Sequence, residues 1–192
     1  NFMGSYNIWE SARQLGVRRV IYASSIHAMG MYPKTTRIDT EMPRRPDTYY
    51  GFAKCFTEDL GQMYWEKEGI ESVHHLLYSC TSQTCNARAL GSWLSFNDLR
   101  QLVERAIDTP YVGFTIVYGV SNNDRSPVDN AAASFLGYRP KDNAEDYAEE
   151  GFAKEPEADL SDIAQTCHGG PFASATLGVS PMGLMAIPDK ED

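Results

Sequence analysis

The chain has 192 residues, of which 42% are hydrophobic and 22% are charged, and its formal net charge is −9. This is the composition of a soluble globular protein that is long enough to bury a core. The acidic charge argues against a nucleic-acid or membrane-surface partner, because either would need a basic surface. No apolar run approaches the roughly 18 residues of a membrane span, and no signal peptide is visible.

The cysteine spacing predicts no metal site and no redox pair. The sequence contains four cysteines, which are Cys55, Cys80, Cys85 and Cys167. Their spacings match neither a zinc-binding pattern nor a C-x-x-C motif. We therefore expect reduced, partly buried thiols in a cytoplasmic protein.

The predicted elements alternate between helices and strands, which indicates an α/β fold. Helices are expected over residues 5–16, 48–68, 95–109 and 128–136, and strands over 17–23, 72–78 and 113–120. Residues 31–47 and 79–94 are expected to be irregular connections, and the acidic stretch 140–161 to include a short solvated helix.

Tyr50 and Lys54 form a Y-x-x-x-K pattern on the predicted helix 48–68. Residues four apart share one helical face, so the phenol and the ammonium can converge. A free phenol is a poor base at neutral pH, and a neighbouring ammonium stabilises the phenolate. The pattern alone is equally compatible with an exposed aromatic ring stacked on a lysine stem. The upstream strand that ends at Ser24 and Ser25 favours a catalytic interpretation.

The order S-S-x-x-x-x-G followed by P-x-x-x-Y-G-x-x-K resembles the extended short-chain dehydrogenase/reductase family, which includes nucleotide-sugar epimerases and dehydratases. More narrowly, residues 4–172 resemble bacterial uronate dehydrogenases in the segments GSYNIWESARQLGVRRVIYASS, RRPDTYYGFAKCFTEDLG, GSWLSFNDLRQLVERAI, GFTIVYGVSNN and HGGPF. The resemblance implies that residues 1–172 form the C-terminal portion of a Rossmann-like, doubly wound parallel sheet, with a flexible tail over 173–192.

The resemblance also implies catalytic roles. Tyr50 would be the base that takes the proton of a sugar hydroxyl while hydride leaves for NAD. Lys54 would stabilise the phenolate and bind the nicotinamide ribose, and Ser25 would hydrogen-bond the reacting oxygen. Asn1 falls where the family carries an asparagine tied to the proton relay.

Binding roles follow from the same resemblance. The substrate-binding positions would be Ser25, Ile26, His27, Ser79, Arg88 and Phe172, and the cofactor-binding positions Tyr50, Lys54, Leu77 and Cys80. An arginine suits a uronate because a guanidinium pairs bidentately with a carboxylate. Outside this context, Arg88 would be read as a solvated loop residue and His27 as a structural one. The pair His74 and His75 is read as structural, since neighbours in a strand point to opposite faces.

The sequence departs from the family pattern at three positions. Ile26 replaces an asparagine that touches the substrate, so one polar contact is lost. Leu76 and Tyr78 stand where the family strand reads Arg-x-Gly, and a tyrosine there could crowd the nicotinamide.

The glycine-rich turn that binds the pyrophosphate in dinucleotide folds is not found in the sequence. We therefore expect roughly 85 residues of the family fold to lie outside this chain. The chain alone is expected to expose a strand edge, to be marginally stable or to associate, and to bind NAD poorly.

The leading hypothesis is the catalytic portion of an NAD-dependent uronate dehydrogenase, which oxidises galacturonate or glucuronate at C1 to an aldarolactone. Its partner would be a small hexuronate, and a homo-oligomer is compatible with the sequence. Two alternatives stay open: a nucleotide-sugar epimerase or dehydratase of the same superfamily, and a non-catalytic fragment that cannot bind NAD by itself.

Overall fold

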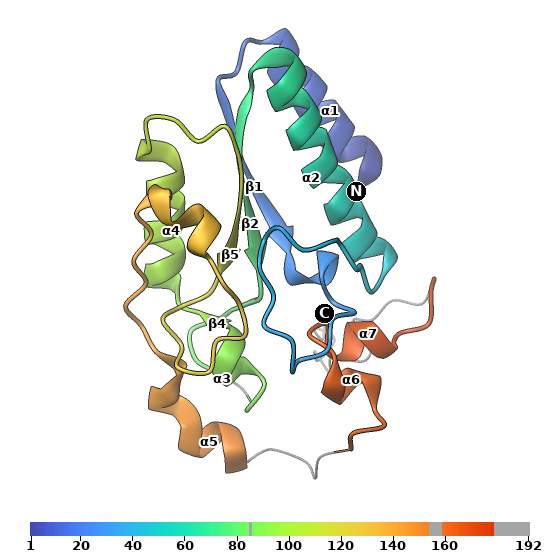
Figure 1. The fold of residues 1–192 in the computed structure, drawn as a ribbon, viewed down its shortest axis with the longest axis vertical. Coiled ribbons are helices and arrows are strands. Elements are labelled where there is room, and N and C mark those ends of the chain that lie inside the picture. Colours follow the sequence, from blue (N-terminus) through green and yellow to red (C-terminus); the bar gives the residue numbers. More distant parts are fainter. Residues whose placement is uncertain (85, 154–158, 179–192) are drawn as a thin grey trace, which may run out of the picture.

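The protein is described by a computed structural model that covers residues 1–84, 86–153 and 159–178. Its centre is a parallel sheet of β1 (Arg19–Ser25), β2 (Glu71–Leu77) and β5 (Phe114–Gly119), in the order β1-β2-β5 (Figure 1). Parallel neighbours joined by helical crossovers are the pattern of a Rossmann-like sheet, so the predicted α/β class is confirmed.

Helices cover both faces of this sheet. α1 (Phe2–Gln14) and α2 (Tyr49–Glu68) pack on one face, where Trp9, Leu60 and Tyr64 form an apolar cluster with Ile70. α4 (Phe96–Asp108) packs on the other face, where Leu102 and Ala106 contact Val73 and Val117 (Figure 1). Because successive strand residues point to opposite faces, β1 contributes Val20 to the first cluster and Ile21 to the second.

Local signals set the helix boundaries. The Thr48 hydroxyl accepts a hydrogen bond from the Gly51 N–H at 3.1 Å and so caps α2, which ends at Gly69 with φ of 69°. Ser95 accepts from the Asp98 N–H at 3.0 Å and caps α4 in an S-x-x-D pattern, at the start of the helix predicted over 95–109. A glycine at positive φ ends a helix without the penalty that a Cβ atom would bring.

Two of the expected segments differ in the structure. The helix predicted over 128–136 is a shorter 3-10 helix, η2 (Ala131–Leu136), because Val128 instead forms a bridge with Ile38. The connection over 79–94 is also more regular than predicted. It contains α3 (Ala89–Ser92) and a two-residue parallel pair of β3 (Ser79–Cys80) with β4 (Trp93–Leu94).

The remaining elements are short, namely η1 (Ile26–Ala28), η3 (Ala144–Tyr147), α5 (Ala148–Ala153), α6 (Ile163–Thr166) and α7 (Pro171–Ser174). η3 and α5 lie in the stretch where a short solvated helix was predicted. Cys55, Cys80 and Cys167 are free thiols, while Cys85 lies outside the described residues. Most of the predicted tail, residues 179–192, lies outside them as well.

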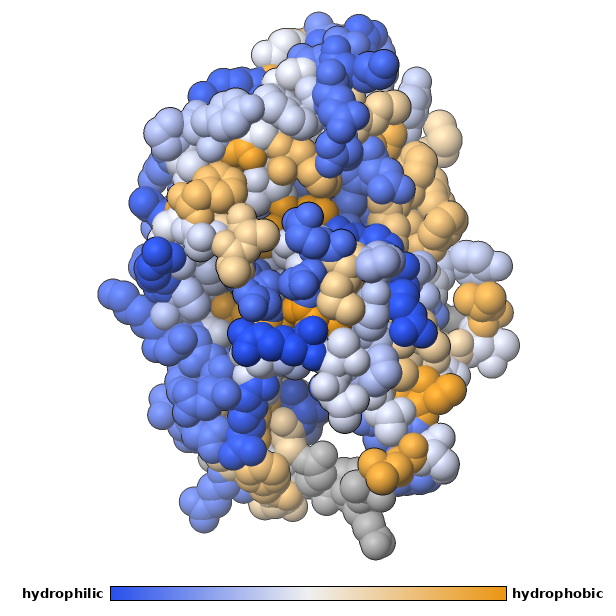
Figure 2. Space-filling view, viewed as in Figure 1, coloured by the Kyte–Doolittle hydropathy of each residue, from blue (hydrophilic) through white to orange (hydrophobic). Residues whose placement is uncertain are grey.

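Among the described strands, β1 pairs only with β2, so its other edge is open. α1 lies near this edge and exposes Met3, Ile8 and Leu15. Figure 2 shows apolar side chains among polar ones over α1 and α2. In the part of the chain that the structure describes, no helix is both long and apolar enough to cross a membrane.

His74 and His75 are buried on opposite faces of β2, as the sequence indicates. The His74 ring stacks near Trp9, with centroids 5.9 Å apart, and its Nε2 lies 3.0 Å from the Ser72 hydroxyl. Within the part of the chain that the structure describes, His74 Nδ1 and His75 Nε2 have no hydrogen-bond partner. Burial lowers the pKa of His74 to about 3 and the pKa of His75 to about 4, so both rings are neutral in the folded chain.

We predict that the free energy of unfolding falls as the pH decreases from about 6.5 to about 4. In that range the unfolded chain binds protons at these histidines and the folded chain does not. His75→Leu should weaken this pH dependence by removing one of the two groups. Urea unfolding between about pH 7 and about pH 4.5 measures it. An equal pH dependence in His75→Leu and the unchanged chain would contradict the prediction.

Candidate active site

The candidate site lies where β1 ends and α2 begins. Ser25 is the last residue of β1 and pairs in register with Leu77 at the end of β2. In open α/β sheets, ligands bind beyond the carboxyl ends of the parallel strands. The Ser25 hydroxyl oxygen accepts a hydrogen bond from the His27 N–H at 3.3 Å, which begins the turn η1. Ser25 itself is 5% exposed.

Tyr50 and Lys54 occupy consecutive turns at the start of α2, on the side that faces β1. Lys54 Nζ donates a hydrogen bond to the Ala23 carbonyl at 2.6 Å. The same ammonium lies 4.7 Å from the Tyr22 ring centroid and 5.4 Å from the Tyr50 ring centroid. Tyr50 is 38% exposed, so its ring is accessible from solvent while a cation stands beside it. This arrangement brings together the Tyr–Lys pair that the sequence predicts.

His27 lies beside Tyr50 within an aromatic cluster. The two rings meet edge to face, with centroids 5.7 Å apart. Phe172, from α7 near the C-terminal end of the described chain, stacks on His27 at a centroid distance of 3.9 Å and lies 6.4 Å from Tyr50. His27 Nδ1 is 2.6 Å from Asp47 Oδ2. The predicted site residues His27, Tyr50 and Phe172 are therefore neighbours in space.

Arg88 is tied to the same C-terminal segment. Its Nη2 donates to the His168 carbonyl at 2.7 Å. Gly170 has a φ of 60°, and a Cβ atom there would lie 2.8 Å from Arg88 Cζ. Only a glycine fits this conformation and this close approach. Residues 168–172 thus connect the Arg88 guanidinium to the ring of Phe172.

A cavity of about 210 Å³ opens beside Arg88 and is lined by Lys34, Tyr78, Ala87, Arg88, Gly91, Ser92, Arg125, Pro127 and His168. The Tyr78 hydroxyl lies 3.1 Å from His168 Nδ1, and His168 Nε2 lies 3.0 Å from the Thr36 carbonyl. A carbonyl can only accept, so Nε2 carries the proton and Nδ1 accepts from Tyr78. Burial keeps the pKa of Tyr78 well above its ordinary value. The Tyr78 hydroxyl is therefore uncharged at neutral pH. It lines a cavity that the side chains of Lys34, Arg88 and Arg125 make cationic.

The chain is similar to known proteins in both sequence and fold. The sequence model of the NAD dependent epimerase/dehydratase family matches residues 1–88. The chain is 44% identical to the uronate dehydrogenase of Pseudomonas putida over 175 residues, which is 91% of this chain and 65% of that protein. Over residues 1–88 the chain therefore has the sequence pattern of the NAD dependent epimerase/dehydratase family. It spans slightly less than two thirds of the length of this relative.

Two solved structures of similar proteins have the same fold. The glucuronic acid dehydrogenase of Chromohalobacter salexigens superposes with a TM-score of 0.89 at 45% identity, over 92% of this chain and 66% of that one. A mutant uronate dehydrogenase of Agrobacterium tumefaciens, solved in complex with NAD, superposes with a TM-score of 0.88 at 39% identity, with the same coverage.

Other predicted positions of the epimerase/dehydratase pattern lie in different surroundings. Asn1 is exposed at the start of α1, and its side chain makes no capping hydrogen bond. Ile26 is 2% exposed and belongs to the core cluster that includes Leu76. Ser79 and Cys80 form β3, which is separated from Leu77 by Tyr78, and burial raises the pKa of the Cys80 thiol. The roles assigned to these residues stay predictions.

The sequence analysis missed one residue of the site, Asp47. It directly precedes Thr48, the N-cap of α2, and its carboxylate contacts both His27 and Thr48. The segment RRPDTYY contains it, but a polar residue next to a helix cap is expected for capping reasons alone. Its contact with His27 depends on the path of the whole connection between β1 and α2.

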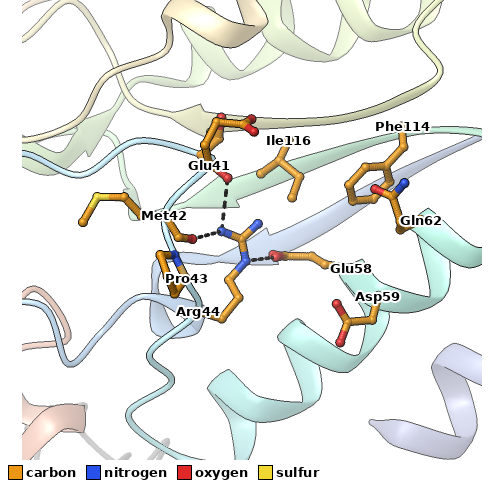
Figure 3. Close-up of a pocket in the computed structure, with 10 residues that line it drawn as sticks. Glu41, Met42, Pro43, Arg44, Glu58, Asp59, Gln62, Phe114 and Ile116 are labelled. Atoms are coloured by element: carbon orange, nitrogen blue, oxygen red, sulfur yellow. Dashed lines mark hydrogen bonds and ion pairs between the residues drawn. The ribbon is translucent and has the colours of Figure 1, made fainter.

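A larger pocket, of about 460 Å³, lies elsewhere and contains none of the predicted site residues. Figure 3 shows Arg44 between Glu58 of α2 and carbonyls of the preceding loop. Arg44 Nε donates to Glu58 Oε2 at 2.6 Å, and Nη1 donates to the Thr40 and Met42 carbonyls, each at 3.3 Å. Ser24 also donates to Glu58. This ion pair fixes the loop that leads to Asp47.

We predict that Arg44→Met destabilises the chain by about 3 kcal/mol, because it leaves the Glu58 carboxylate, which is 2% exposed, without its counter-ion. The double variant Arg44→Met/Glu58→Met should recover much of this loss, since it buries no unpaired charge. Urea unfolding measures both. Arg37→Met is the control, because the Arg37–Asp129 pair is exposed and 3.8 Å long. An Arg44→Met effect no larger than the control would contradict the prediction.

Proposed function

We propose that this chain carries the catalytic residues of an NAD-dependent uronate dehydrogenase, which oxidises the C1 hydroxyl of galacturonate or glucuronate to an aldarolactone. The observation that carries the proposal is the placement of Tyr50 and Lys54 beside the end of β1, next to Ser25. The similarity to uronate dehydrogenases over 91% of the chain supports the substrate class.

The proposed chemistry transfers one proton and one hydride. The Tyr50 phenolate takes the proton of the C1 hydroxyl, the C1–O bond becomes a carbonyl, and the C1 hydrogen leaves with its electron pair. When bound, NAD supplies the acceptor for that hydride. Lys54 stabilises the phenolate by its charge, at 5.4 Å from the Tyr50 ring. Ser25 hydrogen-bonds the reacting oxygen as negative charge develops on it.

The residues at the carboxyl edge of the sheet fit the nicotinamide end of NAD. Tyr50 and Lys54 stand at the carboxyl edge of the sheet, where the nicotinamide ribose would lie, and Leu77 and Cys80 lie at the adjacent strand end. The 192 residues contain no glycine-rich turn for the pyrophosphate. This chain would therefore hold the nicotinamide end and leave most of the dinucleotide without contacts.

Arg88 is the proposed partner of the substrate carboxylate. The protein is acidic overall, so an anionic substrate requires a local cation. Arg88 borders a cationic cavity and is linked through residues 168–172 to Phe172, which lies 6.4 Å from Tyr50. In this proposal, a hexuronate places its carboxylate at Arg88 and its C1 at Tyr50. The free thiols support a reducing compartment, which we propose to be the cytoplasm.

We predict that Tyr50→Phe lowers kcat at least a hundredfold, because general base catalysis typically contributes a factor on the order of 100 to 10,000. The assay follows NADH absorbance with galacturonate. It uses a chimera in which the segment of the Pseudomonas putida relative that precedes the matched region is joined before Asn1. Tyr49→Phe is the matched control, since Tyr49 is adjacent, 61% exposed and outside the site. Equal losses in both variants would refute the role of Tyr50.

We predict that Arg88→Met raises KM for galacturonate about tenfold to a hundredfold, the range expected for a charge-assisted hydrogen bond. It should change KM for galactose, which lacks the carboxylate, much less. The same chimera and assay apply, with Arg37→Met as the control for a lost surface cation. If Arg88→Met affected both sugars equally, Arg88 would not be the carboxylate ligand.

We predict that the 192-residue chain by itself shows no micromolar affinity for NAD, because it lacks the pyrophosphate turn. Isothermal titration calorimetry with NAD tests this, and the chimera is the positive control. Micromolar binding by the isolated chain would contradict the prediction.

A further inference from the structure

The Asp47 side chain is fully buried, with 0% exposure, although carboxylates are rarely buried without partners. One oxygen, Oδ2, lies 2.6 Å from His27 Nδ1. The other, Oδ1, accepts a hydrogen bond from the Thr48 hydroxyl at 2.8 Å. Both oxygens are therefore satisfied, and the contact with His27 is short enough to be a strong, charge-assisted hydrogen bond.

Glycines enclose this carboxylate on two sides. A Cβ atom at Gly30 would lie 1.9 Å from Asp47 Oδ2, and one at Gly169 would lie 2.2 Å from it. The two glycines are also joined directly, since the Gly169 N–H donates to the Gly30 carbonyl at 2.8 Å. The carboxylate consequently has no room to change its position.

The His27 ring is held from three directions. Asp47 binds Nδ1, Phe172 stacks on the ring face at 3.9 Å, and Tyr50 meets the ring at 5.7 Å. Among the described residues, the only hydrogen bond of the His27 ring is the one at Nδ1, and the side chain is 14% exposed. The Nε2 nitrogen therefore remains available, on the part of the ring that does not contact Asp47.

We propose that Asp47 is a positioning residue that acts through His27. A carboxylate can only accept, so it keeps the proton of the neutral imidazole on Nδ1. Nε2 then presents a lone pair and accepts a hydrogen bond from a sugar hydroxyl next to the carbon that reacts at Tyr50. The inference rests on the proposed function for its ligand. In this proposal, His27 accepts a hydrogen bond from a hydroxyl group at one end of the sugar, and Arg88 binds the carboxylate at the other end.

The tautomer can be measured without any turnover. Nitrogen-15 NMR of the 192-residue chain should show His27 protonated at Nδ1 and bare at Nε2. In Asp47→Ala the proton should redistribute toward Nε2, while Asp39→Ala, in the same connection, should leave it unchanged. The Asp39 carboxylate accepts from the Glu41 and Met42 N–H groups and does not contact His27 in the described structure. Protonation at Nε2 in the unchanged chain, or the same tautomer in Asp47→Ala, would overturn the proposal.

A double-mutant cycle in the chimera tests the function of the contact. Asp47→Ala and His27→Ala should each lower kcat/KM for galacturonate about tenfold, the effect of one lost hydrogen bond. The double variant should lose no more than His27→Ala, because Asp47 acts through that ring. Additive losses would show that Asp47 acts independently of His27. A failed Tyr50→Phe test would refute the dehydrogenase and leave the measured tautomer intact.

Discussion

The hydrogen bond between Asp47 and His27 is the contact on which the geometry of the site depends. It joins the turn after β1 to the residue before the N-cap of α2, and so sets Ser25 and Tyr50 relative to each other. Gly30 and Gly169 close around the same carboxylate and bring residues 168–172 against it. One buried group therefore fixes three segments that are distant in sequence, and the roles of Tyr50, Phe172 and Arg88 depend on that arrangement.

The charged and titratable side chains fall into two groups, those that stabilise the fold and those that lie beside the candidate site. Arg44 and Glu58 carry opposite charges and hold the loop on α2, which makes them a structural pair. His74 and His75 are neutral and fill the two faces of β2. The cations beside the candidate site, Lys54 and Arg88, stand out against a net charge of −9. In the proposed function, this contrast would attract an anionic sugar to the site rather than to the rest of the surface.

Much of the fold could be predicted from the sequence, because its signals are local. Thr48 and Ser95 cap α2 and α4, and Gly69 and Gly137 end α2 and η2. Each of these signals depends on residues that lie within about one helical turn of each other. The stacking of Phe172 on His27 and the burial of Asp47 could not be predicted from the sequence, since they depend on packing between residues that are distant in the chain. The β3–β4 pair was missed because two-residue strands carry no periodicity.

The most direct measurement follows the hydrogen that leaves C1. Galacturonate deuterated at C1 would be incubated with NAD and the chimera, and the NADH would be analysed by mass spectrometry. The account predicts NADH that carries the deuterium and a sugar product that has lost it. Unlabelled NADH would contradict the account. So would deuterium retained in the sugar without net NADH, the outcome expected of an epimerase.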